Sequence, residues 1–243
     1  MSEPEIDSRA LVWTGVFARR LGAEVAGTAL LVGVGTGAIV ESYRFGAAVL
    51  GGLAVAWFLA VFIPICLFVR VSGAHLNPAV TLALATSGRI GWREVGPYWG
   101  AQFGGALLGS TLVLVVAGGA RRLGATVPVA GAIPLAFALE FASSVALMLS
   151  VFTLADRGEG PLRWRLLLPP AVVALSTYFI GPWTGSSLNP ARTLAPAVLS
   201  GTYTDIWVYL TAVPAAALAV GALWKPRAVD RLDRGPGRRI VSR

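Results

Sequence analysis

Two copies of an Asn-Pro-Ala triplet are the residues of this sequence best placed to act on a small ligand. They lie in the segments GAHLNPAVTLA and GSSLNPARTLA, which match at eight of eleven positions at an offset of 112 residues. The triplets are Asn77, Pro78, Ala79 and Asn189, Pro190, Ala191, and they contain the chain's only two asparagines. An asparagine amide can donate hydrogen bonds to an oxygen atom of a ligand. For either copy alone, a simple helix-capping role is the alternative.

The sequence offers little for catalysis. It contains one histidine, His75, and one cysteine, Cys66, and no pairing of a nucleophile with a base. A single histidine disfavours a metal site, and a single cysteine cannot form an intramolecular disulfide. We therefore expect a protein that is not an enzyme and that requires no metal or cofactor.

The composition predicts that the elements carrying these residues lie in a membrane. Of 243 residues, 56% are hydrophobic and 13% are charged. This apolar surface exceeds what a soluble domain of this size needs to bury. Six apolar stretches are long enough to span, at 17–40, 46–69, 95–117, 131–155, 165–182 and 205–224. The acidic start MSEPEIDS does not resemble a cleaved signal peptide, so the first stretch should be retained. Glycines expected at helix contacts in the third stretch are Gly100, Gly104, Gly105 and Gly109.

Charge and tryptophan placement predict the topology. With the amino terminus inside, 16 of the 20 basic residues are cytoplasmic, which follows the positive-inside rule. Both termini should then be cytoplasmic in a multi-pass plasma-membrane protein, and topology rather than nucleic-acid binding explains most of the net charge of +8. The segments 1–16 and 225–243 are expected to be cytoplasmic tails, the second basic and close to lipid headgroups. All tryptophans except Trp57 lie near predicted span ends.

The duplication predicts an inverted repeat. Each copy follows the second span of its half, and Glu24 and Glu140 stand 53 and 49 residues before the repeated asparagine. Because each unit has three spans, the copies must have opposite orientations. Repeat 1 covers about 17–117 and repeat 2 about 131–224, within a single domain at 17–224.

The repeated segments themselves predict half-helices. Residues 77–87 and 189–199 are apolar but eleven residues long, roughly 16 Å as helix, or half the hydrocarbon thickness. Asn at the N-cap with Pro at the first helical position favours a helix start there. The irregular backbone before each start must be buried in protein or line a wet cavity. The predicted fold is an all-α membrane protein with six transmembrane helices and two half-helices.

The segments SGAHLNPAVT and GSSLNPARTLAPA resemble the paired signature loops of aquaporins and aquaglyceroporins, the major intrinsic protein family. Glu24 and Glu140 resemble the family's buried glutamates, and Gln102 resembles its third-helix pattern. The similarity covers about 17–224. It implies the aquaporin-like fold, with one pore per subunit, assembly as a homotetramer, and passive passage of water or other small neutral solutes across the lipid bilayer.

Such a pore should exclude protons and ions. Two half-helices that meet at the midplane place positive dipole ends there, and Asn77 and Asn189 can donate to a permeant oxygen. A water held by two donors cannot relay a proton. Arg192 stands where the first copy has Val80, and an intramembrane charge at that position should repel cations.

The buried carboxylates leave one alternative function. Glu24 and Glu140 are expected to accept hydrogen bonds from the unwound backbone before each half-helix, and His75 is expected to order the first loop. A coupled secondary carrier would share inverted repeats and broken helices, with such carboxylates carrying protons. Such a carrier would need a closed, ion-linked substrate site.

The resemblance also places a selectivity filter at Trp57, Thr177, Ser186 and Arg192. Tryptophan at the first position is usual in glycerol channels, and arginine is shared with water channels. The smaller Thr177 replaces the histidine of water channels, a pattern similar to plant nodulin-type intrinsic proteins and their bacterial relatives. Thr193 departs from the aspartate that glycerol channels carry there. Glycerol, urea and neutral metalloid hydroxides therefore stay open as solutes, and a water-selective channel with an unusual filter is the alternative.

Overall fold

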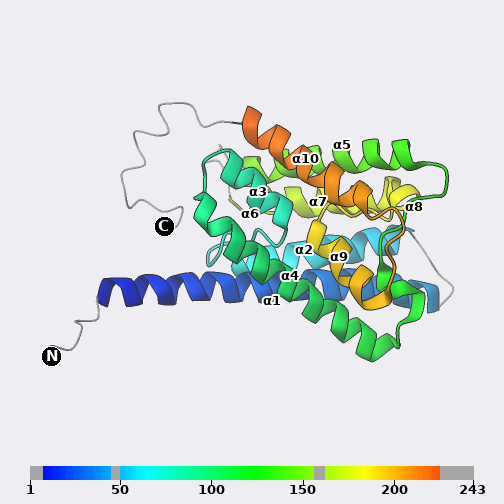
Figure 1. Ribbon diagram of the computed structural model, residues 1–243, viewed down its shortest axis with the longest axis horizontal. Helices are drawn as coiled ribbons and strands as arrows, with labels where there is room; N and C mark the ends of the chain where they lie inside the picture. The colour runs from blue at the N-terminus through cyan, green and yellow to red at the C-terminus, as the bar shows by residue number, and fades with distance from the viewer. Residues whose placement is uncertain (1–7, 45–49, 156–161, 225–243) are drawn as a thin grey trace.

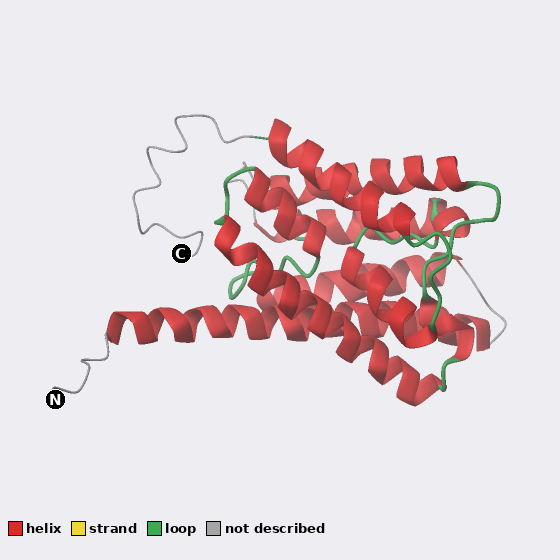
Figure 2. Ribbon diagram, in the orientation of Figure 1, coloured by secondary structure: helices red, strands yellow, loops and turns green. Residues whose placement is uncertain are grey.

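The computed structural model describes residues 8–44, 50–155 and 162–224, and within these ranges every regular element is helical (Figure 2). The first half contains α1 (Ser8–Arg44), α2 (Leu50–Phe68), α3 (Pro78–Thr86) and α4 (Trp92–Ala117), followed by the short turn η1 (Ala120–Gly124). The second half contains α5 (Ile133–Ala155), α6 (Leu162–Arg165), α7 (Leu168–Phe179), α8 (Gly181–Thr184), α9 (Pro190–Ser200) and α10 (Trp207–Leu223). The all-α membrane fold is as predicted, whereas the predicted tail 225–243 and residues 1–7 lie outside the described residues.

The helices pack as two similar halves. In the first half α1 contacts α4 and α2, and in the second half α5 contacts α10 and α7 (Figure 1). The short helices cross between halves, because α3 packs on α10 and α9 packs on α4. Each half-helix is therefore enclosed partly by helices of the opposite repeat.

Two predicted spans differ clearly from the helices of the structure. The helix α1 has 37 residues, about 55 Å, and begins within the segment predicted as an amino-terminal tail. It extends past the other helices at one end of the bundle (Figure 1). The predicted span 165–182 is divided into α6, α7 and α8, because prolines near the start of α7 and α8 lack the N–H that helix continuation requires. Among the residues that the structure describes, α1, α2, α4 and α5 are the helices long and apolar enough to cross a membrane, while α7 and α10 have 12 and 17 residues.

Close helix packing depends on two of the four predicted contact glycines. A Cβ atom on Gly105 would lie 2.3 Å from the carbonyl oxygen of Val25, and one on Gly109 would lie 2.5 Å from that of Ala29. These two glycines let α4 approach α1. Gly100 and Gly104 are not needed for packing within the chain, because a Cβ there would meet nothing within 4 Å.

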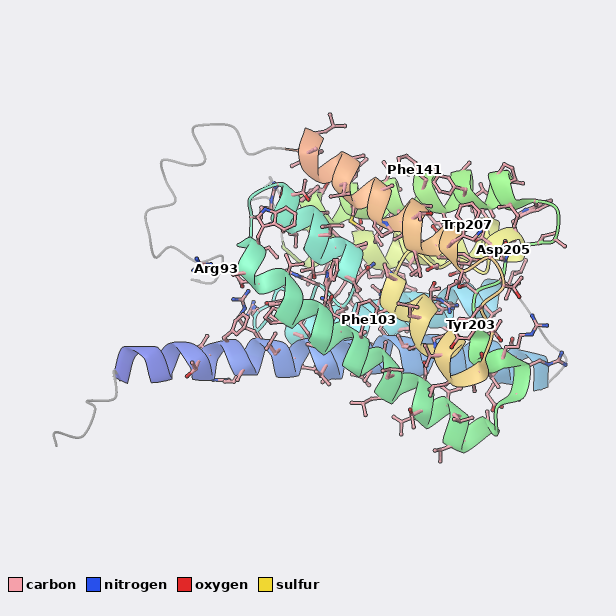
Figure 3. All side chains as sticks on the ribbon, in the orientation of Figure 1. Arg93, Phe103, Phe141, Tyr203, Asp205 and Trp207 are labelled. Atoms are coloured by element: carbon pink, nitrogen blue, oxygen red, sulfur yellow. The ribbon has the colours of Figure 1, made fainter. Side chains whose placement is uncertain are left out.

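Large apolar side chains cover the outside of the bundle, as contact with lipid requires. Tryptophans mark both ends of this surface: Trp92 and Trp164 are exposed at one end, Trp183 and Trp207 at the other. Figure 3 shows Arg93 at the end opposite to Trp207. Trp57 is buried inside the bundle.

Candidate functional site

The half-helices α3 and α9 begin inside the bundle, each at an asparagine. Asn77 and Asn189 have extended backbone conformations, with φ of −155° and −151°. Each side-chain oxygen accepts the backbone N–H two residues further on, at 2.9 Å in both copies. The predicted N-caps, with proline in the first turn, are therefore present in both repeats.

The amide nitrogens of the two asparagines tie the halves together. Asn77 Nδ2 donates to the carbonyl oxygen of Leu188 at 2.8 Å, and Asn189 Nδ2 donates to that of Leu76 at 2.9 Å. A side-chain amide carries two N–H groups. One hydrogen of each amide holds the opposite loop, and the other has no protein acceptor among the described residues.

The two buried glutamates each hold one loop. Glu24 Oε1 accepts the His75 N–H at 2.9 Å, and Oε2 accepts the Leu76 N–H at 2.7 Å. In the second half, Glu140 accepts the N–H groups of Ser187 at 2.9 Å and Leu188 at 3.0 Å. The carboxylates thus satisfy backbone donors that would otherwise be unpaired in a fully buried region.

Two further pairs of residues support the loops, and the sequence reasoning missed them. Ser72 and Thr184 donate their hydroxyl groups to Glu24 and Glu140, at 2.6 and 2.7 Å. Tyr98 and Tyr209 donate to the carbonyl oxygens of Ser72 and Thr184. The signal was available in the repeat itself: Ser72 and Thr184 are related by the same offset of 112, and the tyrosines by 111.

The loop backbone is strained at matching positions. Ala74 and Ser186 have φ of 47° and 49°, and Leu76 and Leu188 both have φ of 53°. Non-glycine residues in this left-handed region cost about 1–3 kcal/mol each. The carboxylate contacts hold this conformation, in which the carbonyls of Leu76 and Leu188 reach the asparagine of the opposite half.

The first loop carries a polar network that includes Gln102, whereas in the second loop the Thr193 hydroxyl contacts the hydroxyls of Ser187 and Thr126 instead. Gln102 Nε2 donates to Glu24 Oε2 and to Thr81 Oγ1, both at 2.9 Å, and His75 Nδ1 lies 3.1 Å from the same hydroxyl. His75 is therefore tied to the first loop, consistent with the ordering role expected for it. Four residues after Tyr209, where Gln102 would have its counterpart, stands Val213.

A cavity of about 700 Å³ runs past both asparagines and ends at Trp57 and Arg192. The Arg192 guanidinium lies 4.8 Å from the centre of the Trp57 ring. Its Nη1 donates to the Gly124 carbonyl at 2.8 Å, and Nη2 lies 3.5 Å from the Gly185 carbonyl. Gly35 makes room for the tryptophan, since a Cβ there would lie 2.5 Å from its ring. Neither Gly35 nor Gly124 was identified from the sequence.

The other two predicted filter residues lie outside this volume. Thr177 and Ser186 are buried but are not among the described residues that line the cavity. The Thr177 hydroxyl donates to the Val173 carbonyl of its own helix at 2.9 Å. The Ser186 hydroxyl is buried and has no hydrogen-bond partner among the described residues. The structure therefore brings together Trp57 and Arg192 but does not bring Thr177 or Ser186 into the same cavity.

Comparison with known proteins finds relatives that are similar in sequence and in fold. The sequence profile of the Major intrinsic protein family matches residues 12–224. The chain is 40% identical over 196 residues to Aquaporin NIP1-3 of Oryza sativa subsp. japonica, covering 80% of this chain and 68% of that protein. It is 42% identical over 205 residues to Aquaporin NIP6-1 of Arabidopsis thaliana, covering 84% of this chain and 67% of that protein. The structure of the aquaglyceroporin from Plasmodium falciparum has the same fold, with a TM-score of 0.71 at 24% identity over 90% of this chain and 100% of that one. This chain, in which Asn77 and Asn189 each bind a carbonyl of the opposite half, therefore belongs to the major intrinsic protein family.

Proposed function

We propose that this protein is a passive transmembrane channel for water and small uncharged solutes, and that permeating molecules pass Asn77 and Asn189. One observation carries this proposal. Each amide donates one N–H to the opposite loop, and its second N–H has no hydrogen-bond acceptor among the described residues. Two donors then remain for a permeant oxygen at the meeting point of α3 and α9. The membership of the family and its plant relatives support the same activity.

The same geometry accounts for the exclusion of ions and protons. The amino ends of α3 and α9 bring positive partial charge to the middle of the cavity. A water that accepts from both amides has its lone pairs engaged, so its hydrogens point away from the asparagines in both directions. A proton cannot be relayed through a water in that orientation. Arg192, buried at one end of the cavity, adds a fixed positive charge that repels cations.

We propose that Trp57, Thr177, Ser186 and Arg192 form the selectivity filter, with Thr177 and Ser186 lining the permeation path beyond the end of the cavity marked by Trp57 and Arg192, and that this filter is wider than that of water-selective members. Thr177 offers a hydroxyl already bonded to its own helix, so it contributes a small and mostly apolar wall. Glycerol, urea or a neutral metalloid hydroxide would then pass as well as water. The alternative within the family is a water-selective channel with an unusual filter.

Stopped-flow light scattering on proteoliposomes tests the channel and its solute range together. Vesicles are challenged with an impermeant osmolyte, then with glycerol, then with urea, and protein-free liposomes serve as the control. We expect faster shrinkage than the control in the first case and faster re-swelling in the other two. Water flux without glycerol or urea flux would refute the wide filter and favour the water-selective alternative. Saturable uptake driven by a pH gradient would instead indicate a carrier.

We further propose that both termini are cytoplasmic, that the protein resides in the plasma membrane and that it assembles as a homotetramer. The start of α1 and the end of α10 lie at the same end of the bundle (Figure 1). That end carries Arg93, whereas Arg121 and Arg122 in η1 lie close to the opposite end of α4. The positive-inside rule then orients the first end to the cytoplasm.

A further inference from the structure

Three arginines surround the end of the cavity that lies opposite Arg192. Arg70 follows α2, Arg89 follows α3 and Arg165 ends α6, and all three line the cavity. The helices α2, α3 and α5 end, and α4 and α7 begin, at the end of the bundle that carries Arg93. The three side chains therefore belong to one opening, which we call the arginine mouth (Arg70, Arg89, Arg165).

We infer that the arginine mouth is a binding site for a polyvalent oxyanion such as a phosphate group, and that an anion bound there slows permeation. No aspartate or glutamate is among the described residues that line the cavity. The walls between the two ends are largely apolar, and low-dielectric walls of this kind focus the field of charges at an opening. Guanidinium groups match the planar geometry of oxyanions and bind them with two parallel hydrogen bonds.

Two of the guanidinium groups are already held in position. Arg89 Nη1 donates to the Trp224 carbonyl at 3.3 Å, and its guanidinium lies 4.5 Å from the centre of the Phe152 ring. Phe152 in turn stacks on Trp224, with ring centres 5.7 Å apart. Arg165 Nη1 lies 3.5 Å from the Leu154 carbonyl. Side chains ordered before binding lose less conformational entropy when a ligand arrives.

The chemistry of the site does not depend on the source of the phosphate. A free polyphosphate in the cytoplasm and the headgroup of an anionic phospholipid present the same oxygens to the arginines. In both cases the anion would occupy the opening through which neutral solutes enter. This inference rests on the proposed channel function, and the experiment below separates the two.

Proteoliposomes of phosphatidylcholine provide the test, with sodium pyrophosphate on both sides and ionic strength held constant with sodium chloride. We expect osmotic water permeability to fall with saturation as pyrophosphate increases. Arg70→Gln and Arg165→Gln should each raise the half-inhibiting concentration about tenfold, since each removes charge-assisted hydrogen bonds. Arg89→Lys should retain more inhibition than Arg89→Gln, because it keeps the charge. Each variant is compared with its own anion-free permeability.

Arg122→Gln is the matched control, because it removes an exposed arginine near the opposite end of the bundle. It should leave both the water permeability and its inhibition by pyrophosphate unchanged. Repeating the series in vesicles that contain phosphatidylglycerol identifies the source. Lower permeability before pyrophosphate is added, relieved in the Gln variants, indicates a headgroup. Inhibition only by added pyrophosphate indicates a free anion.

The inference is overturned if wild-type vesicles conduct water but neither pyrophosphate nor phosphatidylglycerol lowers the permeability. Equal inhibition of the wild type and the Gln variants would overturn it as well. If wild-type vesicles conduct no water, the channel proposal fails. In that case titration calorimetry of pyrophosphate with detergent-solubilised protein tests the anion site alone. Binding to the wild type that is weaker in Arg70→Gln would support the site, and no binding to the wild type would overturn it.

Discussion

Asn77 and Asn189 each use both ends of the side-chain amide. The oxygen caps a half-helix and one N–H holds the carbonyl of the opposite loop, so orientation of the amide is fixed by two protein contacts. An amide fixed in this way presents its remaining N–H without further loss of freedom. The helix-capping interpretation and the ligand-donor interpretation are therefore compatible rather than competing.

Replacing one of these amides by a carboxyl group tests this arrangement. In Asn189→Asp an acceptor would face the Leu76 carbonyl, where a donor now lies at 2.9 Å. Loss of a buried hydrogen bond with an unpaired acceptor left behind costs about 1–3 kcal/mol. We expect slower osmotic shrinkage of proteoliposomes at equal protein content. Thr153→Val, which alters an exposed hydroxyl on α5, should behave as wild type, and unchanged shrinkage in Asn189→Asp would argue against the assigned permeation path.

Gln102 is a second residue whose role can be isolated. Gln102→Leu would remove one donor from the buried Glu24 and one from Thr81. Each lost hydrogen-bond partner should lower the free energy of unfolding by about 1–3 kcal/mol. The melting temperature of Gln102→Leu in detergent should therefore be several degrees below that of the wild type. Ser144→Ala is the control, since the buried Ser144 hydroxyl has no partner among the described residues and its removal should be neutral. Equal melting temperatures for Gln102→Leu and wild type would show that the network is dispensable.

The filter proposal makes a prediction at Thr177. A histidine there would be larger and would add a polar wall, so glycerol and urea permeability should fall more than water permeability. Stopped-flow measurements on the same vesicles give all three rates. Thr177→Val is the control, because it keeps the size of the side chain and removes only a hydroxyl that is bonded to its own helix. A parallel fall of all three rates in Thr177→His would mean that the residue does not discriminate by size.

Among the elements, the half-helices were the most predictable from the sequence. Asn followed by Pro encodes a helix start locally, and the duplication showed that both starts matter. The sequence indicated that Glu24 and Glu140 contact the loops before these helices, but it did not predict the loop conformation. That conformation depends on Glu24 and Glu140, which are distant in the sequence, and on left-handed residues that no local pattern marks.

Helix contacts were only partly predictable for a related reason. Four glycines in one helix look equivalent in the sequence, but only the face toward α1 requires them. The sequence does not specify how α4 is rotated about its axis. The same limit applies to Gly35, which is needed only because Trp57 packs on it.

This difference between glycines can be measured. Gly105→Ala would place a Cβ 2.3 Å from a carbonyl oxygen of α1, so α1 and α4 would have to separate. Overpacking of this kind costs about 1–3 kcal/mol. Gly104→Ala meets nothing within 4 Å and should be neutral or slightly stabilising, since alanine favours helix by about 1 kcal/mol over glycine. We expect a lower melting temperature for Gly105→Ala only, and equal effects of the two substitutions would contradict the packing described.

For the whole molecule, composition and repeat were sufficient to predict an inverted membrane bundle. Helix lengths were less predictable, because an apolar stretch does not show where prolines break a helix or how far a helix extends beyond the apolar residues. The long α1 and the divided 165–182 segment show both effects. The width of the cavity at the filter could not be predicted from the sequence either, because it depends on how side chains from separate helices pack against one another.

The proposed orientation predicts which side chains face the outside of the cell. In a Cys66→Ala background, Arg122→Cys should react with a membrane-impermeant maleimide added to intact cells. Arg93→Cys, at the other end of the bundle, should react only after permeabilisation. The Cys66→Ala background without a new cysteine is the control for unspecific labelling. The reverse pattern would place the termini outside.

The crossed bonds of Asn77 and Asn189 also have a consequence for synthesis. The Leu188 carbonyl that Asn77 binds is made 111 residues later in the chain. At about 5–20 residues per second, the first half-helix waits roughly 6–20 s for its partner. During that time α3 also lacks α10, against which it packs in the finished protein. The first loop can therefore reach its final position only after nearly the whole chain has been inserted, and a chain that stops after α4 would expose unpaired loop groups to cellular quality control.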